Sequence, residues 1–446
     1  MGIAYGMRLT VAGALMALTG VQALQAGAQV VKGKKLACGI VQSFGAKGDG
    51  ITKDTAAIQA AIDKCAAGPQ SAGGKGGRLW GPGTVLLSHG TFLSGPLLLK
   101  SGVQFVIEKG AVLLGSPDRA DYPMITFAGH QTVQSLLSAV NAENVTITGE
   151  GTIDGNGKVW WDYIVGAKDA GVLGNDHPRP FGVLFDHSSH VRMEGVTVQN
   201  SGMWQIVPYY SNDVLIRNVR ILAPKSPNTD AIDPFSSTNV VIDHVFSSTG
   251  DDNIAIKSGA INSPGPDAPS DRITITDCTF ENGHGLSIGS EIAGGVRNVR
   301  AERIHFKGTD QGIRIKSGRD RGNDVSQLFF KDITMEDVKT AVLITEYYPH
   351  PAPEGDVPAE PVGRLTPKFH NITIENVTAT GSDSAGTIVG LPESPVLGLT
   401  MKNVHIAAKT GLSIAYATVS MDDVVVTPQT GDAIKIAPTA TVTIAK

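Results

Sequence analysis

The sequence has few cysteines, no strong excess of either charge and no metal-binding spacing. Three cysteines in 446 residues exclude a disulfide-rich scaffold, and no Cys-x-x-Cys or His-x-x-x-His pair suggests a zinc site. Lys and Arg number 37 against 42 Asp and Glu, which gives a formal charge of −5 without a basic stripe or arm. We therefore expect no metal, no other cofactor and no nucleic-acid partner.

Long apolar runs are also missing after the first residues. The run from Leu9 to Leu24 follows Arg8, and Ala26-Gly27-Ala28 resembles a signal-peptidase site. Because this run contains Thr, Gly and Gln and is short for a membrane-spanning helix, we interpret residues 1–28 as a secretory signal peptide. The remainder, residues 29–446, is expected to be a single domain, secreted to the extracellular space or periplasm, monomeric and without a membrane partner.

Glycine and proline are frequent but not periodic. The 53 Gly and 24 Pro residues lack the Gly-X-Y period of collagen, and a hydrophobic content of 41% is sufficient for a buried core. The sequence therefore predicts a folded globular chain rather than a fibrous or disordered one.

A repeat of short apolar stretches runs through the second half of the chain. From an anchor residue, apolar residues recur at +2 and +5 and often at +7, and position +4 is usually Asn, Asp, His or Arg. This pattern indicates strand, corner, strand, and fits neither helical nor leucine-rich repeats. It predicts an all-β fold, a single-stranded right-handed parallel β-helix. The anchors are Val191, Val214, Val240, Ile273, Val299, Leu328, Ile372, Leu399 and Val419.

A short helix is predicted ahead of the repeats. Asp54 can cap it, and Ile58, Ile62 and Cys65 would share its buried face. We interpret residues 29–80 as a cap over the first coil, in which the Gly-rich stretch from 71 to 77 is a turn. Cys38 and Cys65 flank this unit, and the sequence leaves open whether they form a disulfide.

The third cysteine belongs to the repeats. Cys278 occupies the +5 position that Val or Ile holds in other coils. We therefore expect a buried thiol and not a nucleophile.

The repeat alignment gathers polar residues from four consecutive coils. Asp251 and Asp252 fall at +11 and +12 of one repeat, and His284 falls at +11 of the next. Since neighbouring strands lie about 4.8 Å apart, these side chains should be close together. The preceding coil adds a third carboxylate and the following coil adds two cations, namely Asp230, Arg314 and Lys316.

This set of residues suits a particular chemistry. Crowded carboxylates repel one another and shift each other's pKa values, which separates them into acids and bases. Glycoside hydrolysis uses such a pair, and the neighbouring Arg and Lys suit the carboxylate of a uronic acid. The pattern therefore indicates hydrolysis of a polyuronide.

Four motifs contain these residues in chain order: Asn228-Thr229-Asp230, Gly250-Asp251-Asp252, Gly283-His284-Gly285 and Arg314-Ile315-Lys316. In them the sequence resembles the polygalacturonase family, family 28 of the glycoside hydrolases. The likeness extends through residues 44–50, residues 151–155 and the later coils. The resemblance implies hydrolysis of α-1,4-galacturonosyl linkages in pectin or polygalacturonan, with inversion.

The resemblance also implies roles for single residues. Asp251 would be the general acid, and Asp230 and Asp252 would activate water on the opposite face. His284 would hold the hydrogen bonds of the acid. The residues implied to bind or orient substrate are Asn228, Arg314, Lys316 and Tyr348. Lys257 is either a further cation of the site or a solvated edge residue.

Several alternatives stay open at this point. The same fold could hydrolyse rhamnogalacturonan or xylogalacturonan, cleave pectate as a calcium-dependent lyase, or bind polysaccharide without catalysis. Exo-action is favoured over endo-action because two Pro-rich insertions, residues 263–270 and 349–367, adjoin the coils of His284 and Tyr348 and could close one end of a groove.

Overall fold

The computed structural model describes residues 37–66, 83–170, 178–223, 227–353, 355 and 357–445. The predicted signal segment 1–28 and the Gly-rich stretch 71–77 lie outside these ranges. Among the residues described, no helix is long and apolar enough to cross a membrane.

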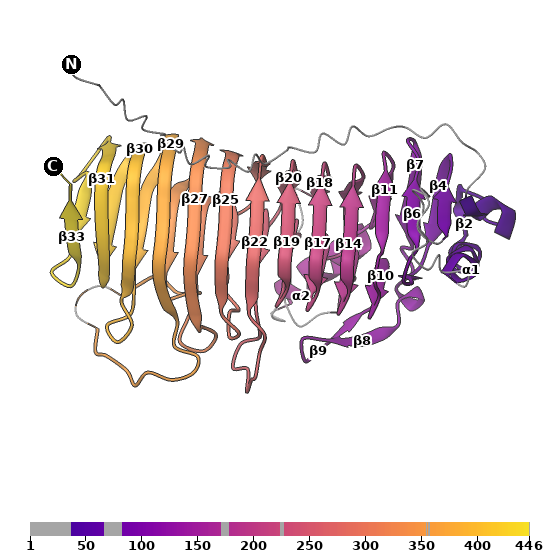
Figure 1. Cartoon of the computed structure of the whole chain (residues 1–446), viewed down its shortest axis with the longest axis horizontal. Coiled ribbons are helices and arrows are strands. Elements are labelled where there is room, and N and C mark those ends of the chain that lie inside the picture. The colour runs from indigo at the N-terminus through magenta and orange to yellow at the C-terminus, as the bar shows by residue number, and fades with distance from the viewer. Residues whose placement is uncertain are drawn as a thin grey trace, which may run out of the picture. The chain divides into compact units, whose positions relative to one another are not determined.

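Short strands of successive coils pair in parallel and stack into a right-handed parallel β-helix, as predicted (Figure 1). The coils present three faces. The strands of the first face are β1 (Ala37–Ile40), β3 (Thr84–Leu87), β6 (Gln104–Ile107), β11 (Thr146–Gly149), β14 (Ser189–Glu194), β17 (Asn212–Arg217), β19 (Thr238–Asp243) and β22 (Ser270–Thr276). Those of the second are β2 (Asp49–Lys53), β4 (Gly90–Ser94), β7 (Ala111–Gly115), β12 (Thr152–Asp154), β15 (Thr197–Gln199), β18 (Arg220–Ala223), β20 (Phe246–Thr249) and β23 (Thr279–Asn282).

The third face carries the candidate site. Its strands are β5 (Leu97–Leu99), β10 (Leu137–Val140), β13 (Val183–Asp186), β16 (Ile206–Tyr209), β21 (Ile254–Ile256), β24 (Leu286–Ile288), β26 (Gln311–Lys316), β28 (Thr340–Thr345) and β32 (Ile434–Ile436). Longer strands run around the corners of the later coils: β25 (Val296–Lys307), β27 (Asp324–Glu336), β29 (Lys368–Val389), β30 (Val396–Ala415) and β31 (Ala417–Pro428), with β33 (Thr441–Ile444) last.

The polar corner of each repeat turns in a left-handed conformation. Eight of the nine residues at position +4, including Asn218, Asp277 and Asn403, have φ between 51° and 56°, and Gly195 has φ 80°. Asn, Asp and Gly tolerate this region better than other residues do. The corner therefore explains why the repeat prefers these residue types between two apolar positions.

The apolar positions of the repeats fill one continuous core. Inward residues of neighbouring coils are in register, as in Val214, Val240 and Ile273, which are 1% exposed or less. Phe280 and Phe306 stack edge to face with their ring centroids 5.4 Å apart. Cys278 lies in this core at 1% exposure, and burial raises its pKa to about 12, which confirms a packing role.

The N-terminal cap is the helix α1 (Thr55–Ala66), which follows the short 3₁₀ helix η1 (Val41–Phe44). Ile58, Ile62 and Cys65 are buried on one side of α1, as predicted. Asp54 stands directly before α1, in the position predicted for its cap, and its carbonyl oxygen accepts a hydrogen bond from the N–H of Ile58 over 3.0 Å. Its carboxylate accepts hydrogen bonds from the backbone N–H groups of Lys47 and Gly48 and so ties the preceding turn to the helix.

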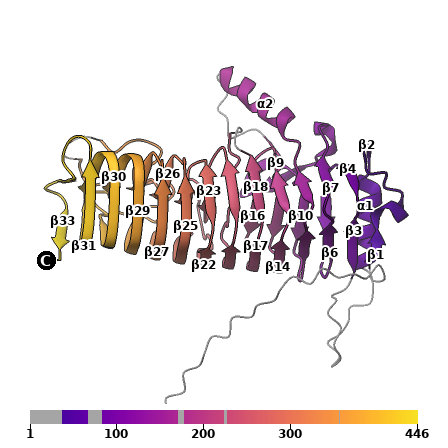
Figure 2. The same ribbon diagram turned by 90° about the horizontal axis from the view of Figure 1, so that it is seen from above.

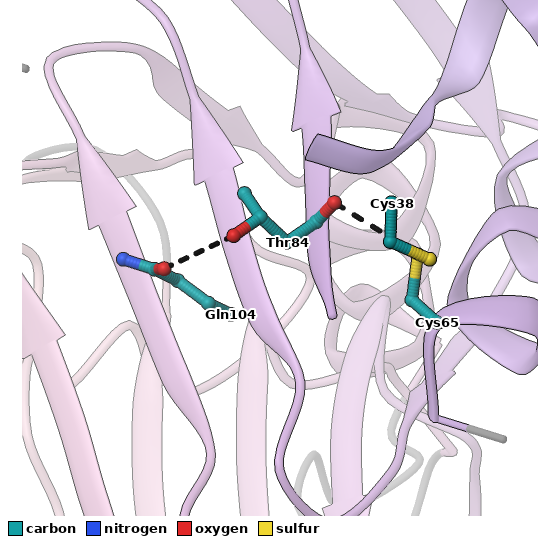
Figure 3. Close-up of a disulfide and its surroundings, with 4 residues drawn as sticks. All are labelled: Cys38, Cys65, Thr84 and Gln104. Atoms are coloured by element: carbon teal, nitrogen blue, oxygen red, sulfur yellow. Dashed lines mark hydrogen bonds between the residues drawn. A yellow bond between two sulfur atoms is a disulfide. The ribbon is translucent and has the colours of Figure 1, made fainter. Parts of the chain in front are cut away.

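The cap is joined covalently to the first coil. Cys38 of β1 and Cys65 of α1 form a disulfide across 27 residues of sequence, which settles the pairing that the sequence left open (Figure 3). The Sγ atom of Cys65 also lies 3.8 Å from the carbonyl oxygen of Thr84 in β3. The cap thus covers the edge strand with a helix and a cross-link.

Insertions between the strands stand beside the third face. A hairpin of β8 (Met124–Phe127) and β9 (His130–Val133) follows the 3₁₀ helix η2 (Arg119–Asp121), and α2 (Lys158–Asp169) follows β12. Figure 2 shows α2 projecting from the stack of coils, and in Figure 1 the hairpin and the loops before β22 and β29 extend from the same edge.

Candidate active site

The candidate site is built where consecutive coils enter the third face. Asp230 lies between β18 and β19, Asp251 and Asp252 lie between β20 and β21, and His284 lies between β23 and β24. Backbone hydrogen bonds align these coils: the N–H of Ala231 donates to the Asp252 carbonyl, and the N–H of His284 donates to the Asp251 carbonyl, each over 2.9 Å.

The glycines on both sides of His284 are required by this alignment. Gly283 has φ +72°, and a Cβ there would lie 2.3 Å from the carbonyl oxygen of Asp251. Gly285 has φ +77°, and its Cβ would lie 2.0 Å from the carbonyl oxygen of Gln311. The Gly-His-Gly motif therefore lets adjacent coils pass close to the imidazole.

Asp251 and His284 form the more exposed half of the cluster. Nδ1 of His284 lies 3.0 Å from Oδ1 of Asp251, and Nε2 of His284 lies 3.3 Å from Oδ2 of Asp310. Burial alone would raise the pKa of Asp251, but the hydrogen bond and charge of His284 and the charge of Lys316 lower it to about 2. The same hydrogen bond raises the pKa of His284 above its ordinary value of 6.5.

Asp252 forms the buried half with both cations of the Arg-Ile-Lys motif. Nη1 of Arg314 lies 3.0 Å from Oδ1 of Asp252, and Nζ of Lys316 lies 2.8 Å from Oδ2. The Ser287 hydroxyl donates to Oδ1 over 2.7 Å. Burial would raise the pKa of Asp252, but Lys316 and Arg314 outweigh it and the pKa is lowered.

Asp230 has the opposite electrostatic environment. It is 3% exposed, and Oδ1 has no hydrogen-bond partner among the described residues. Burial, followed by the nearby Asp233 and Asp251, raises its pKa well above the ordinary value. The pKa of Asp230 is thus shifted in the opposite direction from the pKa values of Asp251 and Asp252, as their crowding predicts.

Substrate-binding candidates surround this cluster. Asn228 lies on the Asp251 side, with its Nδ2 3.5 Å from Oδ2 of Asp251. The ring of Tyr348 lies under both cations, 5.6 Å from the guanidinium of Arg314 and 5.2 Å from Nζ of Lys316. These contacts connect seven of the eight residues predicted for the site, and Asp230 lies in the adjacent coil, where the N–H of Ala231 bonds to the Asp252 carbonyl.

One further residue of the site escapes prediction from the sequence because it lies outside the recognised motifs. Arg179 is buried, and its Nη2 donates to Oδ1 of Asn228 over 2.9 Å. Burial lowers the pKa of Arg179 to about 10, against the opposing charges of Asp230 and Asp251. Arg179 precedes Val191, the first anchor of the repeats, so counting from the anchors could not place it in the site.

Two other residues, Ser287 and Asp233, were also missed and could have been found from register. Ser287 pairs with Ala255 on one side and Arg314 on the other. Asp233 follows Asp230 by three residues and is fully buried. Lys257 is also buried, with Nζ 3.3 Å from Oε2 of Glu291, so the interpretation of Lys257 as a solvated edge residue is wrong.

The cluster also offers ligand atoms for a metal ion. Asp251, Asp252 and His284 present oxygen and nitrogen atoms within 4.8 Å of one another. However, Arg314 and Lys316 already neutralise Asp252 at hydrogen-bond distance, and their charges oppose a divalent cation. The donor set fits acid and base chemistry better than calcium, which prefers six to eight oxygen ligands.

Comparison with known proteins gives consistent results. Residues 90–425 match the model of the glycosyl hydrolases of family 28. A probable polygalacturonase of Vitis vinifera is 33% identical over 388 residues, covering 82% of this chain and 74% of that protein. An endo-polygalacturonase of Pectobacterium carotovorum is 30% identical over 385 residues, covering 82% and 87%.

A solved structure extends the comparison to three dimensions. The hyperthermoactive exopolygalacturonase of Thermotoga maritima superposes with a TM-score of 0.72 at 27% identity. The match covers 88% of this chain and 92% of that one. Relatives with both modes of attack are thus similar to this chain.

Proposed function

The chain belongs to the glycosyl hydrolases of family 28 and is a polygalacturonase-type glycoside hydrolase; on that premise we propose that it hydrolyses α-1,4-linked galacturonan with inversion, attacking from a chain end. The observation that carries the proposal is that Asp252 forms ion pairs with both Arg314 and Lys316, beside the Asp251–His284 pair. These contacts place two cations, which could bind a uronate carboxylate, beside a set of carboxyl groups with unequal pKa values.

Asp251 is the proposed general acid. It is 22% exposed, whereas Asp252 is 2% exposed, so Asp251 is the member of the pair that a glycosidic oxygen can reach. In the free protein the shared proton resides on His284, because the pKa of Asp251 is about 2. A uronate bound to Lys316 offsets one of the charges that lowers this pKa, which favours return of the proton to Asp251.

Asp230 and Asp252 are the proposed pair that activates water. Asp252 is kept ionised by its two cations and can accept a proton from water. Attack by that water on the face opposite the leaving oxygen gives inversion.

Arg314, Lys316 and Tyr348 are the proposed site for the galacturonate carboxylate. A carboxylate placed beside the two cations would share them with Asp252, and charge-assisted hydrogen bonds of this kind are strong. The ring of Tyr348 supports both cations from one side. Asn228 is proposed to orient the substrate next to Asp251.

Exo-action is supported by the β8–β9 hairpin. Phe127 of the hairpin packs on the rings of Phe181, Tyr209 and Phe235, at centroid distances of 4.9, 4.4 and 6.0 Å. Tyr209 and Phe235 lie on the third face in the coils that lead to Lys257. A polymer extending past Asp230 in this direction would meet the hairpin, so the groove would accept a chain end.

The two Pro-rich loops support the same proposal from the other side. Nη1 of Arg364 lies 3.4 Å from Oδ2 of Asp267 and 3.3 Å from the carbonyl oxygen of Ala293, which ties the loop before β29 to the loop before β22. A cavity of about 370 Å³ lies between this loop and Arg319.

The test is a time course on polygalacturonic acid in excess chelator. We expect new reducing ends, early monomer or dimer, slow loss of viscosity and an inverted anomer in the first products by NMR. A rapid viscosity loss with an oligomer ladder would refute exo-action. Loss of activity in chelator, or unsaturated products absorbing in the ultraviolet, would indicate a lyase and refute the proposal.

We also propose that the protein is secreted. The support is the apolar N-terminal segment that ends at Ala26-Gly27-Ala28. Recovery of a chain that begins near Gln29 from periplasm or culture medium is the expected result, and an uncleaved cytoplasmic protein would contradict it.

A further inference from the structure

Lys257 is a buried cation to which the mechanism above gives no role. It follows β21 on the third face, where the pairing of Ile256 with Ile288 and of Ile288 with Ile315 aligns Lys257 with Gly289 and Lys316. Gly289 has φ +100°, and a Cβ there would lie 2.0 Å from the carbonyl oxygen of Lys316. No side chain therefore separates the two lysines along this row.

Two groups hold the ammonium of Lys257 in place. Nζ lies 3.3 Å from Oε2 of Glu291 and 5.1 Å from the ring centroid of Trp204. Lys257 is 6% exposed, so bulk water screens its charge only weakly. Burial would lower the pKa of Lys257, but Glu291, Asp233 and Asp230 raise it well above the ordinary value. Lys257 thus stays charged.

The neighbouring carboxyl groups lack direct partners. Among the described residues, both oxygens of Asp233 and Oδ1 of Asp230 are buried without a hydrogen-bond partner. Asp252 is already bonded to Arg314 and Lys316. Isolated buried carboxylates are strongly disfavoured, so Asp230 can ionise only if a nearby cation compensates for its burial.

We propose that Lys257, clamped between Glu291 and Trp204, is a positioning residue for hydrolysis that supplies the buried positive charge against which Asp230 ionises and helps to activate water. This inference rests on the proposed function. Lys257 acts through Asp230 and does not contact the reacting atoms.

The charged groups around Lys257 and Asp230 determine in which direction the pKa of Asp230 moves when Lys257 is removed. The N–H of Lys257 donates to the carbonyl of Pro234 over 2.9 Å, so Lys257 lies in the coil next to that of Asp230 and Asp233. Besides Lys257, the charges that act on Asp230 are those of Asp233, Asp251, Asp252 and Arg179. Lys257 faces Glu291, Asp233, Asp230 and Asp252. Because the carboxylates outnumber the cations, removal of Lys257 leaves the negative charges to repel one another and favours the protonated form of Asp230.

The first test is the pH profile of kcat/KM for Lys257→Met. We expect its acid limb to move to higher pH by about one unit or more, as for loss of a close opposite charge. KM at the optimum should change little, because Lys257 is proposed to act through Asp230 and not on the substrate. Lys257→Arg should restore the profile. Lys331→Met is the control, since Lys331 pairs with Glu375 away from the site.

Glu291→Gln gives the opposite change and serves if Lys257→Met does not fold. Lys257 then keeps its charge without its nearest carboxylate, so the acid limb should move to lower pH. An active wild-type protein whose acid limb is unmoved in both variants would overturn the role of Lys257. An inactive wild-type protein would instead overturn the proposed function.

Thermal unfolding tests the buried charge without activity. Burial would raise the pKa of Glu291, but Lys257 helps to lower it to about 2 in the folded protein. The resulting contribution to stability is present above pH 4.5 and is lost as the pH falls from 4.5 toward 2. The Tm deficit of Lys257→Met should therefore be larger at pH 7 than at pH 3. An equal deficit at both pH values would overturn the inference.

Discussion

The ammonium of Lys316 lies 2.8 Å from the carboxylate of Asp252, in contact with a group proposed to activate water. In the proposed complex, Lys316 is shared between two carboxylates, that of Asp252 and that of the galacturonate. Binding of the substrate is in this way coupled to the protonation of the catalytic groups.

Lys316→Met and Arg314→Gln should each lower kcat/KM on polygalacturonate by about 10- to 100-fold, as for loss of a charge-assisted hydrogen bond of about 1.5–3 kcal/mol. Because Asp252 also loses a partner, we expect kcat to fall as well as KM to rise. The loss of kcat/KM should be smaller on methyl-esterified substrate than on the free acid. Equal losses on both substrates would contradict contact with the uronate carboxylate.

Asp251→Asn should lower kcat by about 10² to 10⁴, the usual contribution of general acid catalysis. The amide keeps the shape of the side chain and loses the transferable proton. Circular dichroism and Tm serve as controls for folding. Near wild-type turnover would show that another group is the acid.

The pH dependence of stability should follow the Asp251–His284 pair. The raised folded pKa of His284 stabilises the protein below 6.5, and this contribution is lost as the pH rises through the folded value. The lowered pKa of Asp251 contributes above 3.8 and is lost as the pH falls toward 2. The Tm deficit of His284→Gln should therefore be largest between pH 4 and 6.5 and smaller at pH 9. A deficit independent of pH would contradict the ion pair.

Reduction of the Cys38–Cys65 disulfide should loosen the cap. A loop of 27 residues predicts a loss of about 3 to 4 kcal/mol from the chain-entropy effect. We expect faster hydrogen exchange in α1 and a lower Tm in the double variant Cys38→Ser, Cys65→Ser. The buried Cys278 is the matched control, and Cys278→Val should leave the response to reductant unchanged.

Removal of the β8–β9 hairpin should change the mode of attack. The N–H of Gln134 donates to the carbonyl of Pro123 over 2.9 Å, so a short glycine linker can replace residues 124–133. The shortened protein should release longer oligomers early and reduce viscosity faster than the wild type. Phe127→Ala, which weakens the packing alone, should have a smaller effect. An unchanged product pattern would show that the hairpin does not determine the mode of attack.

The sequence was sufficient for the fold and for the grouping of the site because both depend on register. The apolar period predicts the coils, and counting from their anchors places Asp251 next to His284. Arg179 could not be predicted, since it precedes the repeats. Lys257 was ambiguous because its burial depends on Trp204 and Glu291, which belong to other coils.

The left-handed corners at position +4 have a consequence for how the chain can vary. Each corner residue adopts the left-handed conformation of its own turn, as Asn218 and Asn403 do with φ of 52° and 51°. We therefore expect coils at a distance from the site to tolerate gain or loss, provided that the neighbouring coils still cover the core. The consecutive coils that carry Asp230, Asp251, His284 and Arg314 should need to keep their number and order, because the proposed site takes a residue from each of them.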